Sequence, residues 1–178
     1  GRPVHLLKKY GYAGPIYPIN PKADDVQGLT SYASVRDTPT APDMAILAVP
    51  AQATADALRD CAARGVRAAV VLSSGFAEAG PEGAGMQDEL VGIARDANIR
   101  LLGPNCLGTV SVTNAAIGSF SIVLEENMPA AGHVGIVSQS GNIGSFTVQN
   151  VVQRGLGVSR FIATGNEADA IKGADSLM

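Results

Sequence analysis

The sequence predicts a layered α/β protein built around parallel β-sheets. From residue 43 onward, short apolar runs of strand length alternate with longer amphipathic segments, and this alternation is typical of βαβ units. Apolar residues make up 46% of the 178-residue chain, Trp is absent and glycine occurs 21 times. We therefore expect a core of small aliphatic side chains packed closely between backbones.

The first 42 residues predict one helix end and one short strand. PVHLLKKYGY is expected to close a helix that stops at Gly11, because glycine readily takes the left-handed conformation that ends helices. PIYPINP (15–21) predicts a strand ending in prolines, and a polar, irregular stretch follows to Pro42. Because the chain begins within a helix, we expect the first strand of the domain and its glycine turn to be missing.

Three strands and two helices are predicted next. The strands are apolar runs that break into loops: 43–50, 67–76 and 99–108. AQATADALRDCAARG (51–65) predicts a helix with Leu58 and Cys61 on its inner face, and MQDELVGIARDAN (86–98) predicts a second helix. The intervening AEAGPEGAG (77–85) is expected to be a loop, with Glu78 facing solvent.

A second βαβ unit is predicted after an irregular stretch over 108–132, in which IGSFSIVL is only weakly apolar. HVGIVS and VSRFIATG predict strands on either side of the helix GNIGSFTVQNVVQRG (141–155). We place a domain boundary near residues 125–132. The first domain then covers residues 1–127, and residues 128–178 are the N-terminal part of a doubly wound parallel domain.

Charge and cysteine content narrow the classes of function. A net charge of −3 without a dense Lys/Arg cluster gives no general attraction to nucleic acid or to an acidic membrane. Cys61 and Cys106 lack metal-ligand spacing, and no apolar run approaches a membrane span. We expect a cytoplasmic protein with small-molecule partners, no metal, no nucleic acid and no membrane.

The ends of the predicted strands mark a candidate ligand crevice, because open α/β sheets bind ligands beyond the carboxyl ends of their strands. Three strand ends carry the candidates: Asn20, Pro21 and Lys22; Val49 and Pro50; Ser73, Ser74, Gly75 and Phe76. We expect these ends to converge, because the runs should be consecutive strands of one sheet. A lysine, a proline wall and exposed amides suit a nucleotide-like ligand with phosphates. Each set alone is more typical of a simple turn than of a ligand site.

The stretch VGIVSQSGNIGSF (134–146) leaves two interpretations open. Neither Ser138 nor Ser140 has glycine two positions before and two after, which argues against a hydrolase nucleophile. No lysine follows the last glycine, as a P-loop would require. The remaining arrangement of strand, serine, turn and helix suits a phosphate or carboxylate, because helix-start amides and the helix dipole attract anions. A plain serine cap is equally compatible.

Five motifs, taken together and in order, resemble the NDP-forming acyl-CoA synthetases: GYAGPIYPINPK, DMAILAVPA, VVLSSGFAEAG, RLLGPNCLG and GIVSQSGNIG. The resemblance covers almost all of residues 1–169. It implies a Rossmann-like CoA-binding domain followed by the first part of a flavodoxin-like domain shared with the α subunit of succinyl-CoA synthetase. It also implies a reversible reaction in which an acid, CoA and ATP give acyl-CoA, ADP and phosphate, through an acyl phosphate and a phosphorylated histidine.

The resemblance assigns roles by motif match. The three strand-end sets would hold CoA. The phosphate of the phosphohistidine would be held by Ser138, Ser140, Gly141 and Asn142, with Asn105 and Cys106 close to the active site. The histidine is expected downstream, since neither His5 nor His133 matches its motif. ATP/ADP and Mg would be bound by an ATP-grasp domain or subunit of an oligomeric enzyme, so this chain would bind CoA without completing catalysis.

Two other functions remain open, and the first of them is implied by the resemblance. The same domains could form the acyl-CoA-sensing region of a protein lysine acetyltransferase. A stand-alone Rossmann-type nucleotide-binding module is the other alternative. However, Asn20 stands where an NAD-binding domain would carry an acidic residue. The acyl group and the choice between ADP and GDP are not determined by these motifs.

Overall fold

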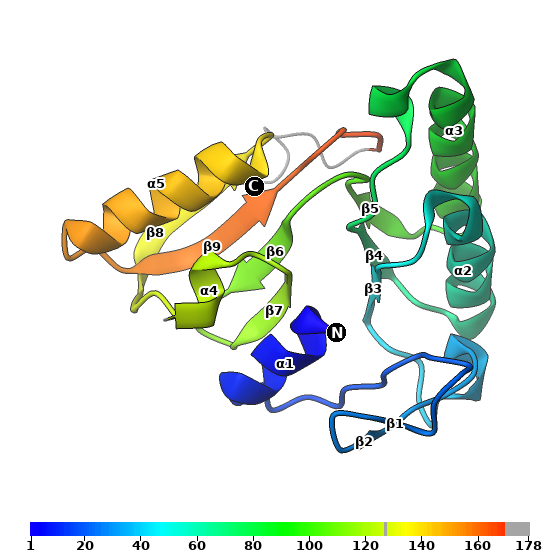
Figure 1. Ribbon diagram of the computed structural model, residues 1–178, viewed down its shortest axis with the longest axis horizontal. Helices are drawn as coiled ribbons and strands as arrows, with labels where there is room; N and C mark the ends of the chain where they lie inside the picture. The colour runs from blue at the N-terminus through cyan, green and yellow to red at the C-terminus, as the bar shows by residue number, and fades with distance from the viewer. Residues whose placement is uncertain (127, 170–178) are drawn as a thin grey trace.

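The protein has the expected α/β fold, with two main sheets that lie side by side in a computed structural model describing residues 1–126 and 128–169 (Figure 1). Residue 127 and residues 170–178, at the ends of the two predicted domains, lie outside the described residues. Within the described part of the chain, each helix is too short or too polar to cross a lipid bilayer.

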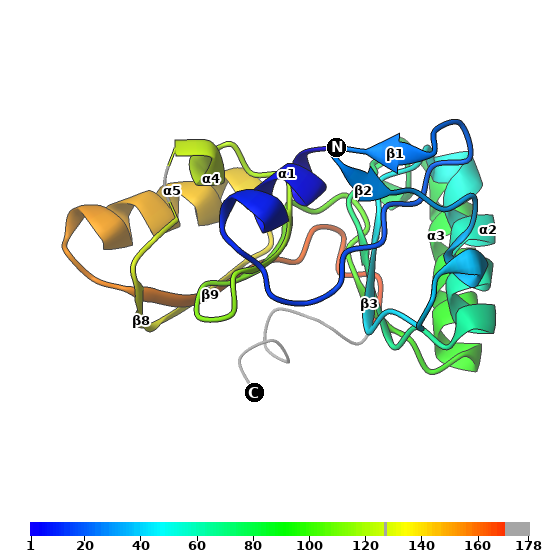
Figure 2. The ribbon, with the colours of Figure 1, turned by 90° about the horizontal axis from the view of Figure 1, so that it is seen from below.

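The first sheet is parallel and has the order β3-β4-β5. Its strands and helices are β3 (Met44–Leu47), α2 (Ala51–Arg64), β4 (Ala68–Val71), α3 (Pro81–Asp96) and β5 (Arg100–Leu102). Figure 2 shows both helices on one face of this sheet. Leu58 and Cys61 of α2 are buried as predicted, and Gly65 ends the helix with a φ of 84°.

Helix α3 begins earlier than the sequence pattern predicted, so the expected loop over 77–85 is wrong for residues 81–85. A 3₁₀ turn, η2 (Ala77–Ala79), leads directly into Pro81 at the start of α3. Proline suits this position, because the first residues of a helix need no amide hydrogen and the fixed φ of proline is helical. Gly83 then lets the helix pass close to Phe76, since a Cβ on Gly83 would overlap the Phe76 carbonyl oxygen.

The N-terminal segment confirms the predicted helix but not the predicted strand. Helix α1 (Arg2–Lys9) ends just before Gly11, which has a φ of 71°. The run 15–21 forms only an isolated bridge between Ile19 and Tyr32. Its prolines explain the error, because each one removes an amide hydrogen that a sheet would use. The short elements β1 (Asp25–Val26), β2 (Leu29–Thr30) and η1 (Val35–Asp37) follow.

The second sheet is mixed and has the order β7-β6-β9-β8. Its elements are β6 (Gly108–Ser111), β7 (Ala116–Ser119), α4 (Val123–Glu126), β8 (Ala131–Ser138), α5 (Gly141–Gln153) and β9 (Val158–Ala163). β8 and β9 are parallel, whereas β6 runs antiparallel to both of its neighbours. The stretch 108–132, expected to be irregular, therefore contains a hairpin and a short helix.

The second sheet is covered by α1 and α5, whose apolar residues join one core. Leu6 of α1 and Val148 of α5 pack in the same buried cluster as Ile136 and Phe161 of the sheet. Gly144 allows close packing of α5, because a Cβ there would lie 2.6 Å from the Phe161 ring. The start of α5 is thereby held directly against the end of β8.

Candidate functional site

A pocket of about 370 Å³ lies where the start of α5 meets the loop after β5. Its lining residues are all uncharged: Leu72, Asn105, Cys106, Leu107, Phe120, Gln139, Ser140, Gly141 and Asn142. The structure thus brings Asn105 and Cys106 next to the α5 start, as the sequence analysis expected. With no charged side chain in the lining, any attraction for an anion must come from backbone amides and the helix dipole.

The α5 start combines a serine cap with open amides. Ser140 Oγ accepts a hydrogen bond from the Ile143 amide at 3.4 Å, and Ser138 Oγ donates to the Ser140 carbonyl at 2.8 Å. Among the described residues, the amides of Gly141 and Asn142 have no acceptor. The serine cap is therefore confirmed, and two amides remain that could bind a ligand, so the anion site stays a prediction.

Asn105 and Cys106 form one wall of the pocket. The Asn105 amide donates to the Ser73 carbonyl at 2.8 Å, which ties this wall to the loop after β4. Cys106 is buried, and its thiol donates to the Val71 carbonyl at 3.4 Å. Burial raises the pKa of Cys106 to about 11. The thiol is thus protonated at neutral pH and cannot serve as a nucleophile.

The ends of β3 and β4 converge as predicted. Ser73 Oγ donates to the Val49 carbonyl, and a Cβ on Gly75 would lie 3.3 Å from the Ala51 side chain. Pro50 precedes α2 and provides no side-chain cap. Among the described residues, no acceptor binds the amides of Ala51 and Gln52. An uncapped helix start therefore lies against the loop after β4.

The amides of the loop after β4 are already bound by Glu78, which was expected to face solvent. The Glu78 carboxylate accepts from the Gly75 amide at 2.6 Å and from the Phe76 amide at 3.2 Å. Burial by itself raises the pKa of Glu78. Hydrogen bonds from Asn166 and from these amides outweigh that effect, so the pKa lies below its usual value. Glu78 is exposed, as expected, and it still reaches these amides because it lies three residues from Gly75 in a tight turn.

Asn20, Pro21 and Lys22 lie in the segment before β1, outside the two main sheets. The Asn20 amide donates to the Tyr32 carbonyl at 2.9 Å, and the segment lies with β1 and β2. The loop after β2 packs against the last turn of α2, where Arg64 donates to the Thr38 carbonyl at 2.7 Å. Pro50 is at the opposite end of α2. The predicted strand over 15–21 does not form, so among the described residues no sheet pairing ties this segment to the other two strand ends, and their convergence stays a prediction.

The loop after β9 carries site residues that the sequence analysis missed. Asn166 donates to Glu78 and Gln87 and accepts from Asn105, and Gln139 Nε2 donates to the Gly165 carbonyl. The strand-end rule would have marked this loop, because Asn166 and Glu167 directly follow the predicted strand over 158–165.

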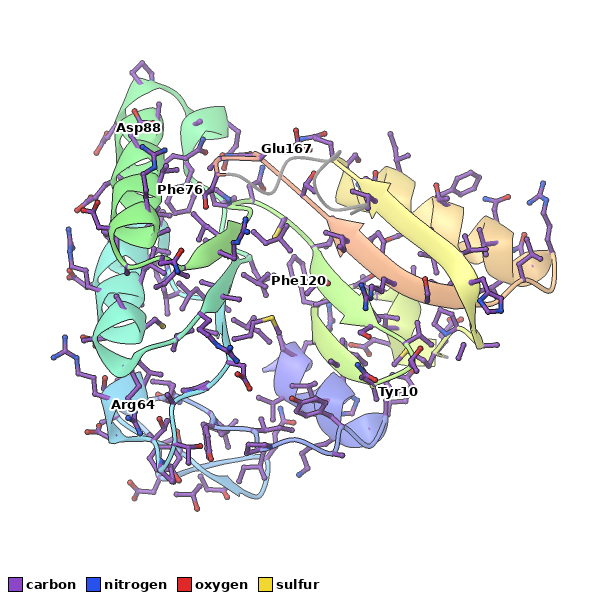
Figure 3. The ribbon with its side chains drawn as sticks, turned by 180° about the vertical axis from the view of Figure 1, so that it is seen from behind. Tyr10, Arg64, Phe76, Asp88, Phe120 and Glu167 are labelled. Atoms are coloured by element: carbon purple, nitrogen blue, oxygen red, sulfur yellow. The ribbon has the colours of Figure 1, made fainter. Side chains whose placement is uncertain are left out.

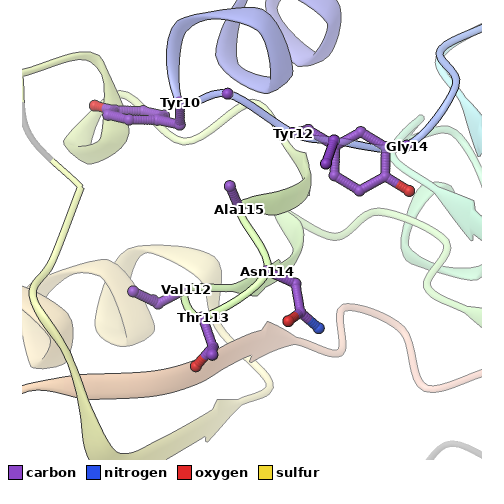
Figure 4. A pocket seen from close by; sticks show the side chains of 9 residues that line it. Tyr10, Tyr12, Gly14, Val112, Thr113, Asn114 and Ala115 are labelled. Carbon is purple, nitrogen blue, oxygen red and sulfur yellow. The ribbon is translucent and has the colours of Figure 1, made fainter.

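A larger pocket, of about 600 Å³, lies elsewhere and contains none of the predicted site residues. It is formed by the end of α1 with residues 10–14 and by the turn between β6 and β7 with residues 112–115 (Figure 4). Tyr10 faces it while donating to the Leu124 carbonyl. The smaller pocket is the candidate site, because it combines open amides with the residues predicted from the motifs.

Comparison with known protein families decides what the first part of the chain is. Residues 2–111 match the CoA binding domain, and residues 131–177 match the succinyl-CoA ligase like flavodoxin domain. The chain belongs to the CoA binding domain family. Both matches agree with the resemblance noted in the sequence. Within the described part of this CoA-binding chain, no cluster of His, Cys, Asp and Glu could hold a metal ion.

Individual relatives agree with the family. The α subunit of ADP-forming acetate–CoA ligase II from Pyrococcus furiosus is 37% identical over 92% of this chain and 34% of its own length. Trans-feruloyl-CoA synthase from an unknown prokaryotic organism is 42% identical over 93% of this chain and 24% of its own length. The CoA-binding chain therefore spans about a quarter to a third of these relatives.

A solved structure matches almost the whole chain. It is the dinucleotide forming acetyl-coenzyme A synthetase 1 of Ca. Korarchaeum cryptofilum, in complex with phosphate and ADP. The TM-score is 0.90 at 34% identity, and the match covers 99% of this chain and 36% of that one. The arrangement of the two sheets in the CoA-binding chain is thus shared with this synthetase.

Proposed function

We propose that this chain is the CoA-binding portion of an ADP-forming acyl-CoA synthetase. The complete enzyme would convert an acid, CoA and ATP into acyl-CoA, ADP and phosphate. The observation that carries the proposal is the placement of two helix starts with open amides, those of α2 and α5, on either side of the connected loops after β4 and β5. One helix start suits the phosphates of CoA, and the other suits a separate anion.

The α2 start and its neighbouring loop fit CoA chemically. The amides of Ala51 and Gln52 lie at the positive end of a 14-residue helix with no acidic residue in its first turn. Pro50 and the exposed Ser74 provide an apolar wall and a free hydroxyl beside them. Since Glu78 holds the amides of Gly75 and Phe76, we propose that this loop contacts CoA through Ser74 and supports the site through Ser73.

The α5 start is the proposed phosphate subsite. Gly141 and Asn142 would donate their amides to phosphate oxygens, while Ser138 and Ser140 hold the turn in place. The protonated Cys106 thiol supplies an uncharged wall. The role of this chain is thus to bind and orient ligands.

The remaining parts of the proposal concern the rest of the protein. An ATP-grasp domain or partner subunit would bind ATP, ADP and Mg in an oligomeric, cytoplasmic enzyme. The relative from Pyrococcus furiosus is named as an α subunit, which supports a partner of this kind. The names of the relatives also favour a ligase over an acetyltransferase. Because one is named for acetate and another for a feruloyl group, we assign no acyl group.

Calorimetric titration of the chain with CoA tests the proposal. We expect one saturable site that binds CoA more tightly than pantetheine, which lacks the nucleotide phosphates, and that does not bind NAD. Gln52→Glu should weaken CoA binding about tenfold, because it places a negative charge beside the proposed phosphate position. The same substitution should not destabilise α2, since acidic residues are favourable in a first turn.

The matched control is Gln149→Glu, which makes the same change of charge at an exposed position in the middle of α5. It should leave CoA affinity unchanged. Absence of CoA binding to the unmodified chain would contradict the proposal, as would equal affinity for CoA and pantetheine. In the full-length protein, release of ADP from ATP beyond one turnover per site should require both CoA and a carboxylic acid.

A further inference from the structure

The loop after β9 connects the second sheet to the loops of the first (Figures 1 and 3). Figure 3 labels Glu167 in this loop, beside the segment that contains Phe76. At its centre, Asn166 Nδ2 donates to Glu78 at 2.5 Å and to Gln87 at 2.9 Å. Asn166 Oδ1 accepts from Asn105 Nδ2 at 3.2 Å. Both ends of the Asn166 amide are therefore used.

The backbone of the same loop is held from two sides. The Gly165 amide donates to the Gln139 carbonyl at 3.2 Å, and Gln139 Nε2 donates back to the Gly165 carbonyl at 2.9 Å. On the other side, the Asn166 amide donates to the Pro104 carbonyl at 2.9 Å. Gly165 has a φ of 63°, and a Cβ there would overlap the Pro104 oxygen. The loop is thus fixed between the α5 start and the loop after β5.

Glu78 extends this connection to the proposed CoA loop. One carboxylate oxygen accepts from the amides of Gly75 and Phe76, and the other accepts from Asn166. These hydrogen bonds are charge-assisted, so they are stronger than those between neutral groups. A continuous path of hydrogen bonds therefore runs from Gly75 through Glu78 and Asn166 to Asn105 at the pocket.

We propose that Asn166 is a positioning residue that couples the CoA subsite to the phosphate subsite. This inference rests on the proposed function. The Asn166 side-chain amide donates to Glu78 and accepts from Asn105 at once, so it fixes the pocket wall relative to the CoA loop. A ligand that shifts one loop then also shifts the other. CoA and phosphate must therefore change each other's affinity by the same factor.

The test is calorimetric titration of the chain with CoA, with and without saturating inorganic phosphate. In the unmodified chain, phosphate should change the Kd for CoA about fivefold or more. Asn166→Asp places a second carboxylate beside Glu78, which breaks the contact by repulsion, and should bring that factor close to one. Glu78→Gln interrupts the same contact from its other partner and should act similarly.

The double variant Glu78→Gln/Asn166→Asp reverses donor and acceptor and should restore the coupling. The matched control is Asn114→Asp, at an exposed position in the turn between β6 and β7, which should leave the coupling unchanged. A merely structural role for Asn166 would lower the unfolding temperature without changing the coupling factor.

The outcomes separate the two proposals. Coupling in the Asn166→Asp chain that equals the unmodified value would overturn the inference, as would the absence of any coupling in an unmodified chain that binds CoA. In both cases the proposed CoA-binding function stands. An unmodified chain that binds no CoA contradicts the proposed function itself. If Asn166→Asp does not fold, Glu78→Gln and the double variant carry the same comparison.

Discussion

The loop after β4 and the loop after β8 both follow parallel strands and precede helical structure, yet their amides are satisfied differently. After β4, the Glu78 carboxylate binds the amides of Gly75 and Phe76. After β8, the amides of Gly141 and Asn142 have no acceptor among the described residues. The first loop therefore serves as a scaffold whose amides a protein carboxylate already occupies. The second loop can bind an anion without displacing a group of the protein.

The difference follows from the local placement of acidic residues. Glu78 lies three residues after Gly75, within reach of the amides that the turn exposes. Helix α5 has no acidic residue in its first turn, and its cap Ser140 reaches only the Ile143 amide. Strand-end position alone thus does not identify an anion site, because the side chains that follow decide whether the amides remain open.

The largest expected effect concerns the scaffold role of the loop after β4. Gly83→Ala should destabilise the fold by about 3 kcal/mol or more, because the added Cβ overlaps the Phe76 carbonyl and displaces α3. The free energy of unfolding in urea measures this. Gly85→Ala is the matched control, since nothing lies near its added Cβ. It should stabilise the helix by up to about 1 kcal/mol, and equal effects at the two sites would contradict the scaffold role.

Cys106 lies in the pocket wall next to both loops, and its burial should make the folding stability depend on pH. The pKa of Cys106 rises from 9.0 to about 11 on folding, so the folded state holds this proton more tightly than the unfolded state. The resulting stability, about 2 to 3 kcal/mol, is fully present below pH 9 and is lost as pH rises toward 11. The stability difference between the unmodified chain and Cys106→Ala should therefore shrink between pH 9 and pH 11. A constant difference would mean that the thiol is solvated.

A charge at the open helix start should weaken anion binding. Asn142→Asp places a carboxylate at the amides proposed to bind phosphate, so phosphate affinity should fall about tenfold, or about 1.4 kcal/mol. Titration with inorganic phosphate measures this, and Gln149→Glu on the same helix should have little effect. Folding stability should not decrease, because the helix dipole favours the new charge. Unchanged phosphate affinity would contradict the proposed phosphate subsite.

Much of the fold was predictable because its signals are local. Helix α2 has an apolar stripe and a terminal glycine, and β8 and β9 are apolar runs flanking an amphipathic helix. The hairpin of β6 and β7 was not predictable, since each strand has only four residues and β6 is fixed by pairing with β9, far along the chain.

The candidate site also has one part that was predictable from the sequence and one part that was not. The convergence of Ser140 with Asn105 follows from the rule that ligands bind at strand ends, and the structure places both in one pocket. The contact of Asn166 with Glu78 joins residues 88 positions apart. No local pattern encodes that contact, so only the folded structure reveals it.

The smallest expected effect concerns the segment before β1, which lies outside the two main sheets. Lys22 is exposed and lies just before β1. If it contacts a CoA phosphate, as the motif match predicts, Lys22→Glu should weaken CoA binding by about 1 kcal/mol or more, because repulsion replaces a charge-assisted contact. Arg95→Glu makes the same change of charge near the end of α3 and serves as the control. Equal CoA affinity of the two variants would restrict the CoA subsite to the α2 start. The effect of Gln52→Glu would then have to account for the whole electrostatic contribution to CoA binding.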